Sequence, residues 1–199
     1  MFDSTLDYYD QNAADFIART IDTDLSALYA PFLALLKPGA SILDLGCGSG
    51  RDSKYFIEHG YTVEAVDGSC ELCKIASKYI GQPVRQLLFQ DLDYIGAFDA
   101  VWANASLLHV PSHALPDILR KISDALKPNG ILFASFKHGN FSGERDGRMF
   151  TDLTEQDLIQ IAEDASGFEI VYTLVTQDAR PGRSDEKWLN AILRRRHYP

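Results

Sequence analysis

The segment at residues 42–52, Ile-Leu-Asp-Leu-Gly-Cys-Gly-Ser-Gly-Arg-Asp, constrains the fold of this chain more than any other stretch. Its apolar residues suit the carboxyl end of a buried parallel strand. Three alternating glycines then let the backbone turn tightly and approach a ligand closely. A helix can begin at Arg51. A strand, a glycine turn and a helix in this order predict a nucleotide-type binding cradle.

The glycine spacing and one acid indicate which ligand the cradle holds. A dinucleotide fingerprint reads Gly-x-Gly-x-x-Gly and faces a pyrophosphate. This chain has Gly-x-Gly-x-Gly instead, with Asp44 two residues before the first glycine. A carboxylate there is badly placed for a pyrophosphate and well placed for a cation. S-adenosylmethionine carries a sulfonium and an ammonium and no phosphate, so the charges favour it over NAD. A helix-capping role for Asp44 stays open.

Apolar spacing predicts alternating helices and strands along the whole chain. The predicted helices lie at 11–20, 24–36, 51–59, 70–79, 114–126 and 154–164, and the strands at 41–45, 62–66, 84–89, 98–103, 130–136, 168–175 and 186–195. Such alternation predicts an α/β fold, a Rossmann-like doubly wound sheet of about seven mostly parallel strands with helices on both faces. The last two strands have a connection too short for a crossover helix, which predicts an antiparallel edge hairpin.

The remaining segments complete the expected organisation. Residues 138–150 are rich in glycine and charge, and we expect a loop or lid there. We expect a single domain over 1–199, with a helical cap at 1–37 and a core at 40–199. An NAD dehydrogenase would need a further domain for its substrate, which also disfavours that alternative.

Composition bounds the partners of the chain. With 46% hydrophobic and 24% charged residues it is an ordinary globular sequence. No apolar run approaches the ~18 residues of a membrane helix, and no signal peptide is evident, so we expect a cytoplasmic protein without membrane contact. Cys47, Cys70 and Cys73 are an odd number, and Cys-x-x-Cys lacks a second ligand pair, so no metal site is expected. A net charge of −9 argues against nucleic acid.

Four further segments follow the glycine turn in a recognisable order and spacing, and with it they make the chain resemble the class I S-adenosylmethionine-dependent methyltransferases. They are Tyr-Thr-Val-Glu-Ala-Val-Asp at 61–67, Gln-Asp-Leu at 90–92, the stretch 98–110 and Leu-Lys-Pro-Asn-Gly-Ile-Leu at 126–132. The resemblance spans roughly residues 8–196 and implies S-adenosylmethionine as the cofactor.

The resemblance also implies a set of cofactor contacts, some of which have simpler interpretations. An acid about 20 residues after the glycine motif pairs with ribose hydroxyls, although Asp67 could equally form a turn and a helix cap. Asp91 could be a solvated loop acid. The implied cofactor-binding residues are Tyr9, Asp44, Gly46, Cys47, Gly48, Gly50, Asp67, Gly68, Ser69, Asp91, Leu92 and Asn104.

His109 follows the fourth strand, where the resemblance places the methyl acceptor. An imidazole there could accept a proton from the attacking group near neutral pH, which makes His109 the candidate catalytic base. Transfer from a sulfonium, however, is an in-line displacement that needs mostly alignment and a desolvated pocket. A hydrogen-bonded residue at a helix start is the alternative role for His109.

Four basic residues come from segments that should meet near the pocket mouth, Lys137, Arg148, Arg180 and Arg183. Guanidinium groups bind oxyanions through two parallel hydrogen bonds, so these residues predict an anionic acceptor. Solvated surface charge is the alternative.

The whole chain resembles small bacterial methyltransferases of the tellurite-resistance type. The segments that carry this resemblance are Ser135-Phe136-Lys137 and the tail from Asp178 to Trp-Leu-Asn. That resemblance implies a small-molecule acceptor, anionic or chalcogen-containing. A methyltransferase acting on tRNA or protein and a non-catalytic S-adenosylmethionine-binding protein remain alternatives. We expect a monomer or a homodimer.

Overall fold

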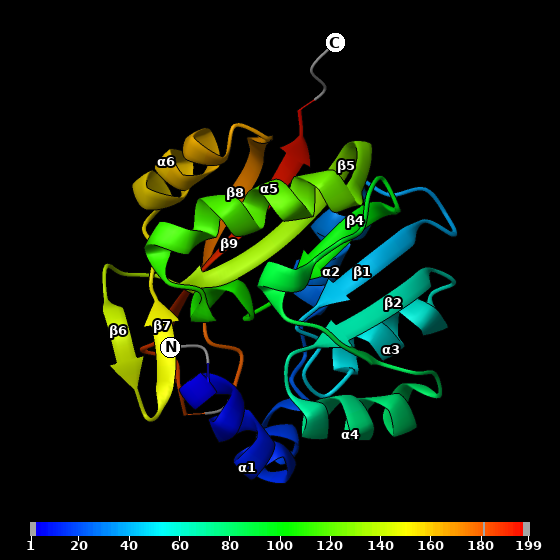
Figure 1. Ribbon diagram of the computed structural model, residues 1–199, viewed down its shortest axis with the longest axis vertical. Coiled ribbons are helices and arrows are strands. Elements are labelled where there is room, and N and C mark those ends of the chain that lie inside the picture. The colour runs from blue at the N-terminus through cyan, green and yellow to red at the C-terminus, as the bar shows by residue number, and fades with distance from the viewer. Residues whose placement is uncertain (1–2, 181, 197–199) are drawn as a thin grey trace.

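A single seven-stranded sheet forms the centre of the protein, in a computed structural model that describes residues 3–180 and 182–196 (Figure 1). Its strand order is β3-β2-β1-β4-β5-β9-β8. The strands are β1 (Ser41–Leu45), β2 (Thr62–Asp67), β3 (Arg85–Gln86), β4 (Phe98–Ala103), β5 (Leu126–Lys137), β8 (Phe168–Gln177) and β9 (Lys187–Arg195). The first five pair in parallel, whereas β9 is antiparallel to both β5 and β8. The predicted α/β class and the antiparallel carboxyl-terminal pair are therefore confirmed.

Helices cover both faces of the sheet. They are α1 (Asp3–Thr20), α2 (Ser26–Leu33), α3 (Arg51–Glu58), α4 (Cys70–Ile80), α5 (Leu115–Ala125) and α6 (Glu155–Ala165), with short 3-10 turns η1 (Phe89–Asp91), η2 (Leu107–His109) and η3 (Ser112–Ala114). Side chains of α5 and α6 pack with one face of the sheet, and those of α2 and α3 pack with the other. This is the two-layer covering that a mostly parallel sheet requires.

The core is divided between these two faces because successive strand residues point in opposite directions. Val101 of β4 belongs to the cluster under α5 and α6, and its neighbour Trp102 belongs to the cluster under α2 and α3. Trp102 is fully buried and stacks on Phe133 of β5 with ring centroids 3.9 Å apart. The sheet therefore offers a rigid platform whose strand ends hold the polar residues described below.

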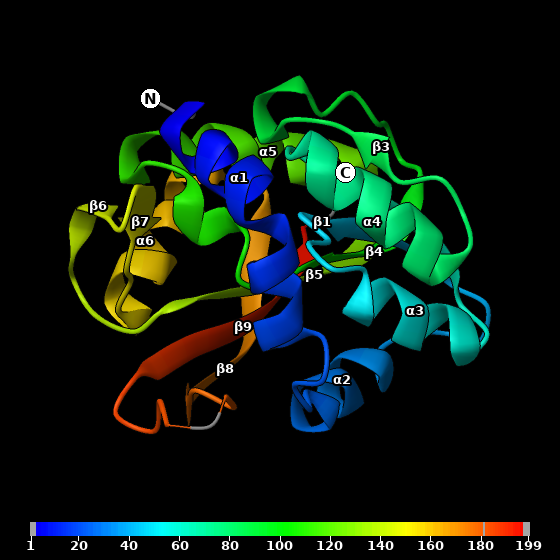
Figure 2. The same cartoon turned by 90° about the horizontal axis from the view of Figure 1, so that it is seen from below.

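Helix α1 lies beyond the carboxyl ends of the central strands, below them in Figure 1 and in front of them in Figure 2. The helix is kinked at Asn12. Asp10 accepts hydrogen bonds from the Ser69 hydroxyl and the Glu71 amide at the start of α4. Nearer its amino end, Thr5 accepts a hydrogen bond from the Met149 amide. Helix α1 thus connects the β2 side of this sheet edge with the β5 side.

The segment 138–150 differs from its prediction. Instead of a loop it contributes most of a two-stranded hairpin, β6 (Ser142–Arg145) and β7 (Arg148–Thr151). Asp146 and Gly147 at its tip both have positive φ, 50° and 76°. Two consecutive left-handed residues, often Asp-Gly, form the turn that suits a tight hairpin. That local chemistry outweighs the density of glycine and charge on which the loop prediction depended.

Two other boundaries are corrected by the structure. The third strand was predicted over 84–89, but β3 pairs with β2 through Arg85 and Gln86 alone. The chain then leaves the sheet through η1, which directs residues 89–90 toward the strand ends. The first helix begins at Asp3 rather than residue 11.

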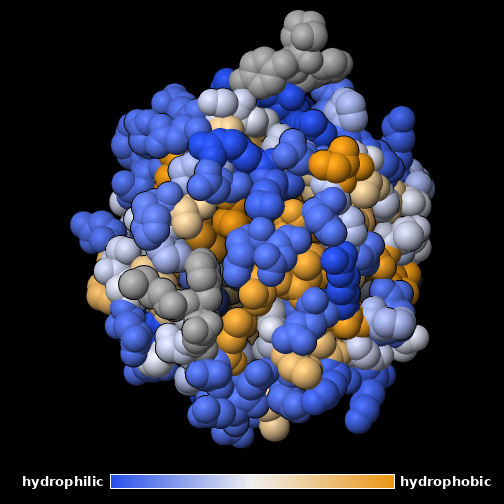
Figure 3. Space-filling model, in the orientation of Figure 1, coloured by the Kyte–Doolittle hydropathy of each residue, from blue (hydrophilic) through white to orange (hydrophobic). Residues whose placement is uncertain are grey.

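The surface is mostly hydrophilic in the face that Figure 3 shows, with apolar side chains gathered in a band across its centre. Among residues 3–180 and 182–196, no helix has both the length and the apolar character needed to cross a bilayer.

Candidate active site

A cavity of about 730 Å³ opens at the carboxyl ends of the parallel strands. It lies beside the switch point between β1 and β4, where the strand order reverses and where open α/β sheets bind ligands. The wall is built from the glycine turn after β1, helix α1, η1, the turn after β4, the β6–β7 hairpin and the β8–β9 connection. Since β9 runs antiparallel, its amino end reaches the same edge.

The glycine turn adopts a backbone that side chains would disturb. Gly46 has φ of 79°, and a Cβ atom added there would lie 2.5 Å from Cβ of Ser106. Gly48 has φ of 55° and lies against the Phe16 ring. Both residues line the cavity. Gly50 instead packs against Ile80 of α4, so its small size serves helix packing.

Asp67 ends β2 and lines the cavity next to this turn. Its carboxylate accepts hydrogen bonds from the Gly48 amide at 2.8 Å and the Ser69 amide at 2.9 Å. Burial raises the pKa of Asp67, while these two amides oppose the shift. The carboxylate therefore fixes the glycine turn and retains lone pairs for a ligand on the cavity side.

Asp44 lies behind the glycine turn and is not part of the cavity wall. It is almost fully buried and accepts a hydrogen bond of 2.6 Å from the Ser53 hydroxyl. Burial and the neighbouring Asp52 carboxylate raise the pKa of Asp44 to about 8. The acid that the sequence analysis aimed at a cationic ligand is thus a buried support of the turn in this structure.

Asp52 lines the cavity, and the sequence analysis did not select it. Its carboxylate accepts hydrogen bonds from Arg51, Tyr29, Trp102 and Asn104 at 2.6 to 3.1 Å. Burial opposes ionisation, but Arg51 and the other donors hold its pKa below the ordinary value. The sequence signal was an acid two residues after the third glycine, because that position lies in the first turn of α3, at the ligand end of the sheet.

The remaining predicted cofactor residues divide into two groups. Tyr9, Cys47, Gly68 and Asn104 line the cavity. The structure places Ser69, Asp91 and Leu92 elsewhere: Ser69 caps α4, Asp91 is exposed and Leu92 belongs to the core. In η1 the lining residues are Phe89 and Gln90, two positions before the predicted Asp91 and Leu92.

His109 lies on the opposite side of the cavity with both ring nitrogens engaged. Nδ1 lies 2.6 Å from the Met149 carbonyl oxygen, and Nε2 lies 2.8 Å from the Tyr9 hydroxyl. A carbonyl can only accept, so Nδ1 carries the proton and Nε2 accepts from Tyr9. Burial lowers the pKa of His109 to about 4 and raises that of Tyr9. The imidazole is therefore neutral and a weak base at pH 7.

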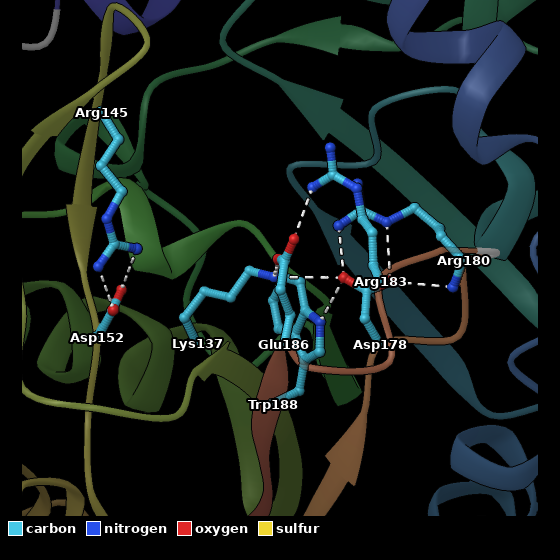
Figure 4. Close-up of polar contacts among 8 residues, drawn as sticks. All are labelled: Lys137, Arg145, Asp152, Asp178, Arg180, Arg183, Glu186 and Trp188. Carbon is cyan, nitrogen blue, oxygen red and sulfur yellow. Dashed lines mark hydrogen bonds and ion pairs between the residues drawn. The ribbon is translucent and has the colours of Figure 1, made fainter.

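Three of the four predicted basic residues meet in one network (Figure 4). Lys137 pairs with Asp178 at 3.2 Å and with Glu186, and its ammonium lies 4.1 Å from the Trp188 ring centroid. Arg180 forms a two-pronged pair with Asp178, and Arg183 pairs with Glu186. Burial opposes ionisation of Asp178, but Arg180 and Trp188 hold its pKa well below the usual range. The charges of this network are largely neutralised within the protein.

Arg148, the fourth, lines the cavity from β7 and lies apart from that network. Its guanidinium carbon is 4.3 Å from the Tyr8 ring centroid and 5.2 Å from that of Phe150. The sequence therefore placed all four basic residues at one cavity, but it could not show that acids would pair with three of them.

Residues 17–172 match the model of a protein family that is described as a methyltransferase domain. The chain belongs to this family, the class I S-adenosylmethionine-dependent methyltransferases. A ubiquinone biosynthesis O-methyltransferase of Xanthomonas campestris is 37% identical over 105 residues, which are 49% of this chain and 43% of that protein. The chain thus covers less than half the length of this curated methyltransferase.

Solved methyltransferase structures agree with the fold. The 1,6-didemethyltoxoflavin-N1-methyltransferase of Burkholderia thailandensis, with bound 1,6-didemethyltoxoflavin and S-adenosylhomocysteine, is 26% identical with a TM-score of 0.76 over 96% of this chain and 87% of its own. The magnesium protoporphyrin IX methyltransferase of Synechocystis covers 96% of this chain and 97% of its own at TM-score 0.73. At 20% identity it supports the fold alone.

Proposed function

We propose that this protein transfers the methyl group of S-adenosylmethionine to a small molecule bound in the same cavity. The observation that carries the proposal is that one cavity joins two chemically different ends. Asp67 is hydrogen-bonded to the glycine turn in one group of lining residues, and Tyr9, which contacts His109 and Arg148, belongs to a second group. A methyl donor and an acceptor must share one desolvated space for in-line transfer, and this arrangement supplies it.

The residues at the first end fit the cofactor. The close approach at Gly46 and Gly48 leaves room for a ligand, and Asp67 offers the carboxylate that ribose hydroxyls require. Asp52, whose pKa is held low by Arg51 and the other donors, places a carboxylate on the wall of the same cavity. When bound, S-adenosylmethionine supplies an electrophilic methyl group on a positively charged sulfur.

At the second end the protein aligns the acceptor rather than deprotonating it strongly. His109 is neutral and already accepts a hydrogen bond from Tyr9, which leaves it little capacity as a base. Tyr9 and Phe150 offer flat apolar surface beside polar groups. We infer an acceptor whose reacting atom is nucleophilic without a strong base.

The acceptor class is supported by the relatives. The Xanthomonas relative is named for O-methyl transfer in ubiquinone biosynthesis, and the Burkholderia structure holds 1,6-didemethyltoxoflavin. The resemblance to tellurite-resistance methyltransferases adds an anionic or chalcogen-containing acceptor to the proposal. Acids of the protein pair with three of the four basic residues on which the anionic acceptor was predicted. No feature of the described residues favours a tRNA or protein substrate, and none favours a non-catalytic role.

A coupled assay of S-adenosylhomocysteine release tests the proposal. Wild-type protein is incubated with S-adenosylmethionine and, in turn, catechol, a hydroquinone, a nitrogen heterocycle and tellurite. The expected result is acceptor-dependent release with at least one of the small molecules, and slower release at limiting S-adenosylmethionine when Asp67→Ala weakens cofactor binding. Cofactor binding without release for any acceptor, including bulk tRNA and protein substrates, would support the non-catalytic alternative.

A further inference from the structure

Nearly every cation of the cavity wall has an acid of the protein as an ion-pair partner. Each of these pairs has a nitrogen–oxygen distance of 3.2 Å or less. The paired side chains are Arg51, Lys137, Arg145, Arg180 and Arg183. Lys187 is exposed, so water can solvate its ammonium. Arg148 is the exception, since it is half-buried and no acid of the described chain lies within ion-pair distance.

The guanidinium of Arg148 is held against aromatic rings instead of an acid. Tyr8 and Phe150 lie at 4.3 and 5.2 Å from its central carbon, and Tyr9 lies at 5.9 Å. Its Nε atom is buried and has no hydrogen-bond partner in the described structure. Aromatic faces attract a cation but leave its N–H donors unsatisfied. The protein therefore keeps an incompletely satisfied positive charge at the acceptor end.

The position of Arg148 is fixed from two sides. The neighbouring Met149 amide donates to Thr5 of α1, and the Met149 carbonyl accepts from His109. These bonds tie β7 to the same Tyr9–His109 pair that faces the acceptor. A cation held this rigidly loses little freedom on pairing, so an anionic group of a ligand can supply the missing partner at low cost.

We propose that Arg148 recognises a carboxylate on a flat acceptor, and that it is the residue through which the protein selects anionic over neutral acceptors. This inference rests on the proposed methyl transfer. A carboxylate matches the guanidinium fork, and a flat ring matches the faces of Tyr9 and Phe150. Because every cation of the Lys137 network already has an acid as its ion-pair partner, Arg148 is the cation most available to an anionic group.

The test compares two probes that differ mainly in charge, 4-hydroxybenzoate and 4-hydroxybenzamide. Each is titrated by calorimetry into protein saturated with S-adenosylhomocysteine. The wild type should bind the benzoate at least about tenfold more tightly than the benzamide, as expected for hydrogen bonds to a charged group. Arg148→Gln should reduce that preference to about one, with unchanged benzamide binding. Arg148→Lys, which keeps the charge but not the fork, should retain part of it.

Arg120→Gln is the matched control, because Arg120 is exposed on α5 and its loss changes the net charge equally. It should leave the preference intact. Equal binding of the two probes, no binding of the benzoate, or an unchanged preference in Arg148→Gln would overturn the inference. Weaker S-adenosylhomocysteine binding in Arg148→Gln with the preference retained would assign the residue to the cofactor carboxylate and also overturn it. If the wild type binds no S-adenosylhomocysteine in the first titration, the proposed function fails and this inference with it.

Discussion

The two ends of the cavity are built in different ways. The cofactor end is formed by the glycine turn after β1 and by Asp67 at the end of β2, where backbone amides and glycines define much of the surface. The acceptor end is formed by long side chains from α1, β5, β7 and the β8–β9 connection. Its shape depends on which of these side chains pair with one another, as Lys137 does with Asp178.

This difference determines what substitutions should do at each end. A backbone-built surface tolerates almost no added atom, so single changes there should be severe and should affect cofactor binding. A surface of paired side chains can lose one member and rearrange, so changes there should be milder and should affect acceptor selection. The following predictions order these effects from the largest to the smallest.

Gly46→Ala should cause the largest loss. A positive φ costs about 1–2 kcal/mol for a residue with a Cβ atom, and the 2.5 Å approach to Ser106 adds overpacking of about 1–3 kcal/mol. Gly60→Ala is the matched control, because Gly60 has φ of 83° with nothing within 4 Å. Urea unfolding measures both. Equal losses in the two variants would show that the turn is not closely packed.

Asp44→Asn should change how stability depends on pH. The pKa of Asp44 rises from 3.8 to about 8 on burial. A raised carboxyl pKa gives stability that is full below the unfolded pKa and is lost as pH rises through the folded pKa. The wild type should therefore lose a few kcal/mol relative to Asp44→Asn between pH 5 and pH 8. If the free energy of unfolding changed with pH equally in the two proteins, the result would contradict the burial of this acid.

Asp67→Ala and Asp178→Ala compare acids from the two ends. Loss of Asp67 should weaken S-adenosylhomocysteine binding by about 1–3 kcal/mol, the usual cost of losing a hydrogen-bonded charged partner. Loss of Asp178 frees Arg180 and leaves Lys137 paired with Glu186, but it should leave that affinity within about twofold. Calorimetry with both variants checks this. An unchanged affinity for Asp67→Ala would make that residue a turn support only.

His109→Asn should have the smallest effect on turnover, below about tenfold, with an acceptor found by the release assay. A general base contributes about 10²–10⁴-fold, but His109 is neutral and hydrogen-bonded at both nitrogens. With a pKa of about 4, it should also give no inflection in the pH profile of kcat between pH 6 and pH 7. A hundredfold fall with such an inflection would restore His109 as the base.

Much of the fold was predictable because its signals are local. Buried apolar runs mark the central strands, and the short connection between β8 and β9 correctly indicated an antiparallel pair. The β6–β7 hairpin was missed even though Asp146-Gly147 is a turn signal, because the strand before the turn, Ser-Gly-Glu-Arg, contains no hydrophobic side chain.

The part of the site that depends on short sequence motifs was predictable. The glycine turn and Asp67 lie in consecutive or regularly spaced residues and line the cavity as a group. The role of Asp52 and the ion pairs of Lys137 were not predictable, since they depend on partners far along the chain. Trp102, for example, donates to Asp52 across 50 positions. The sequence shows which charges are present, but only the fold shows which of them neutralise one another.

Calorimetric titration of the purified protein with S-adenosylhomocysteine and, separately, with NAD⁺ tests the central claim most directly. Gly46, Gly48 and Asp67 form a cradle without a pyrophosphate-binding spacing, in a chain of the methyltransferase-domain family. The account predicts one molecule of S-adenosylhomocysteine bound with a micromolar dissociation constant and no heat from NAD⁺. Binding of NAD⁺ with no response to S-adenosylhomocysteine would contradict it.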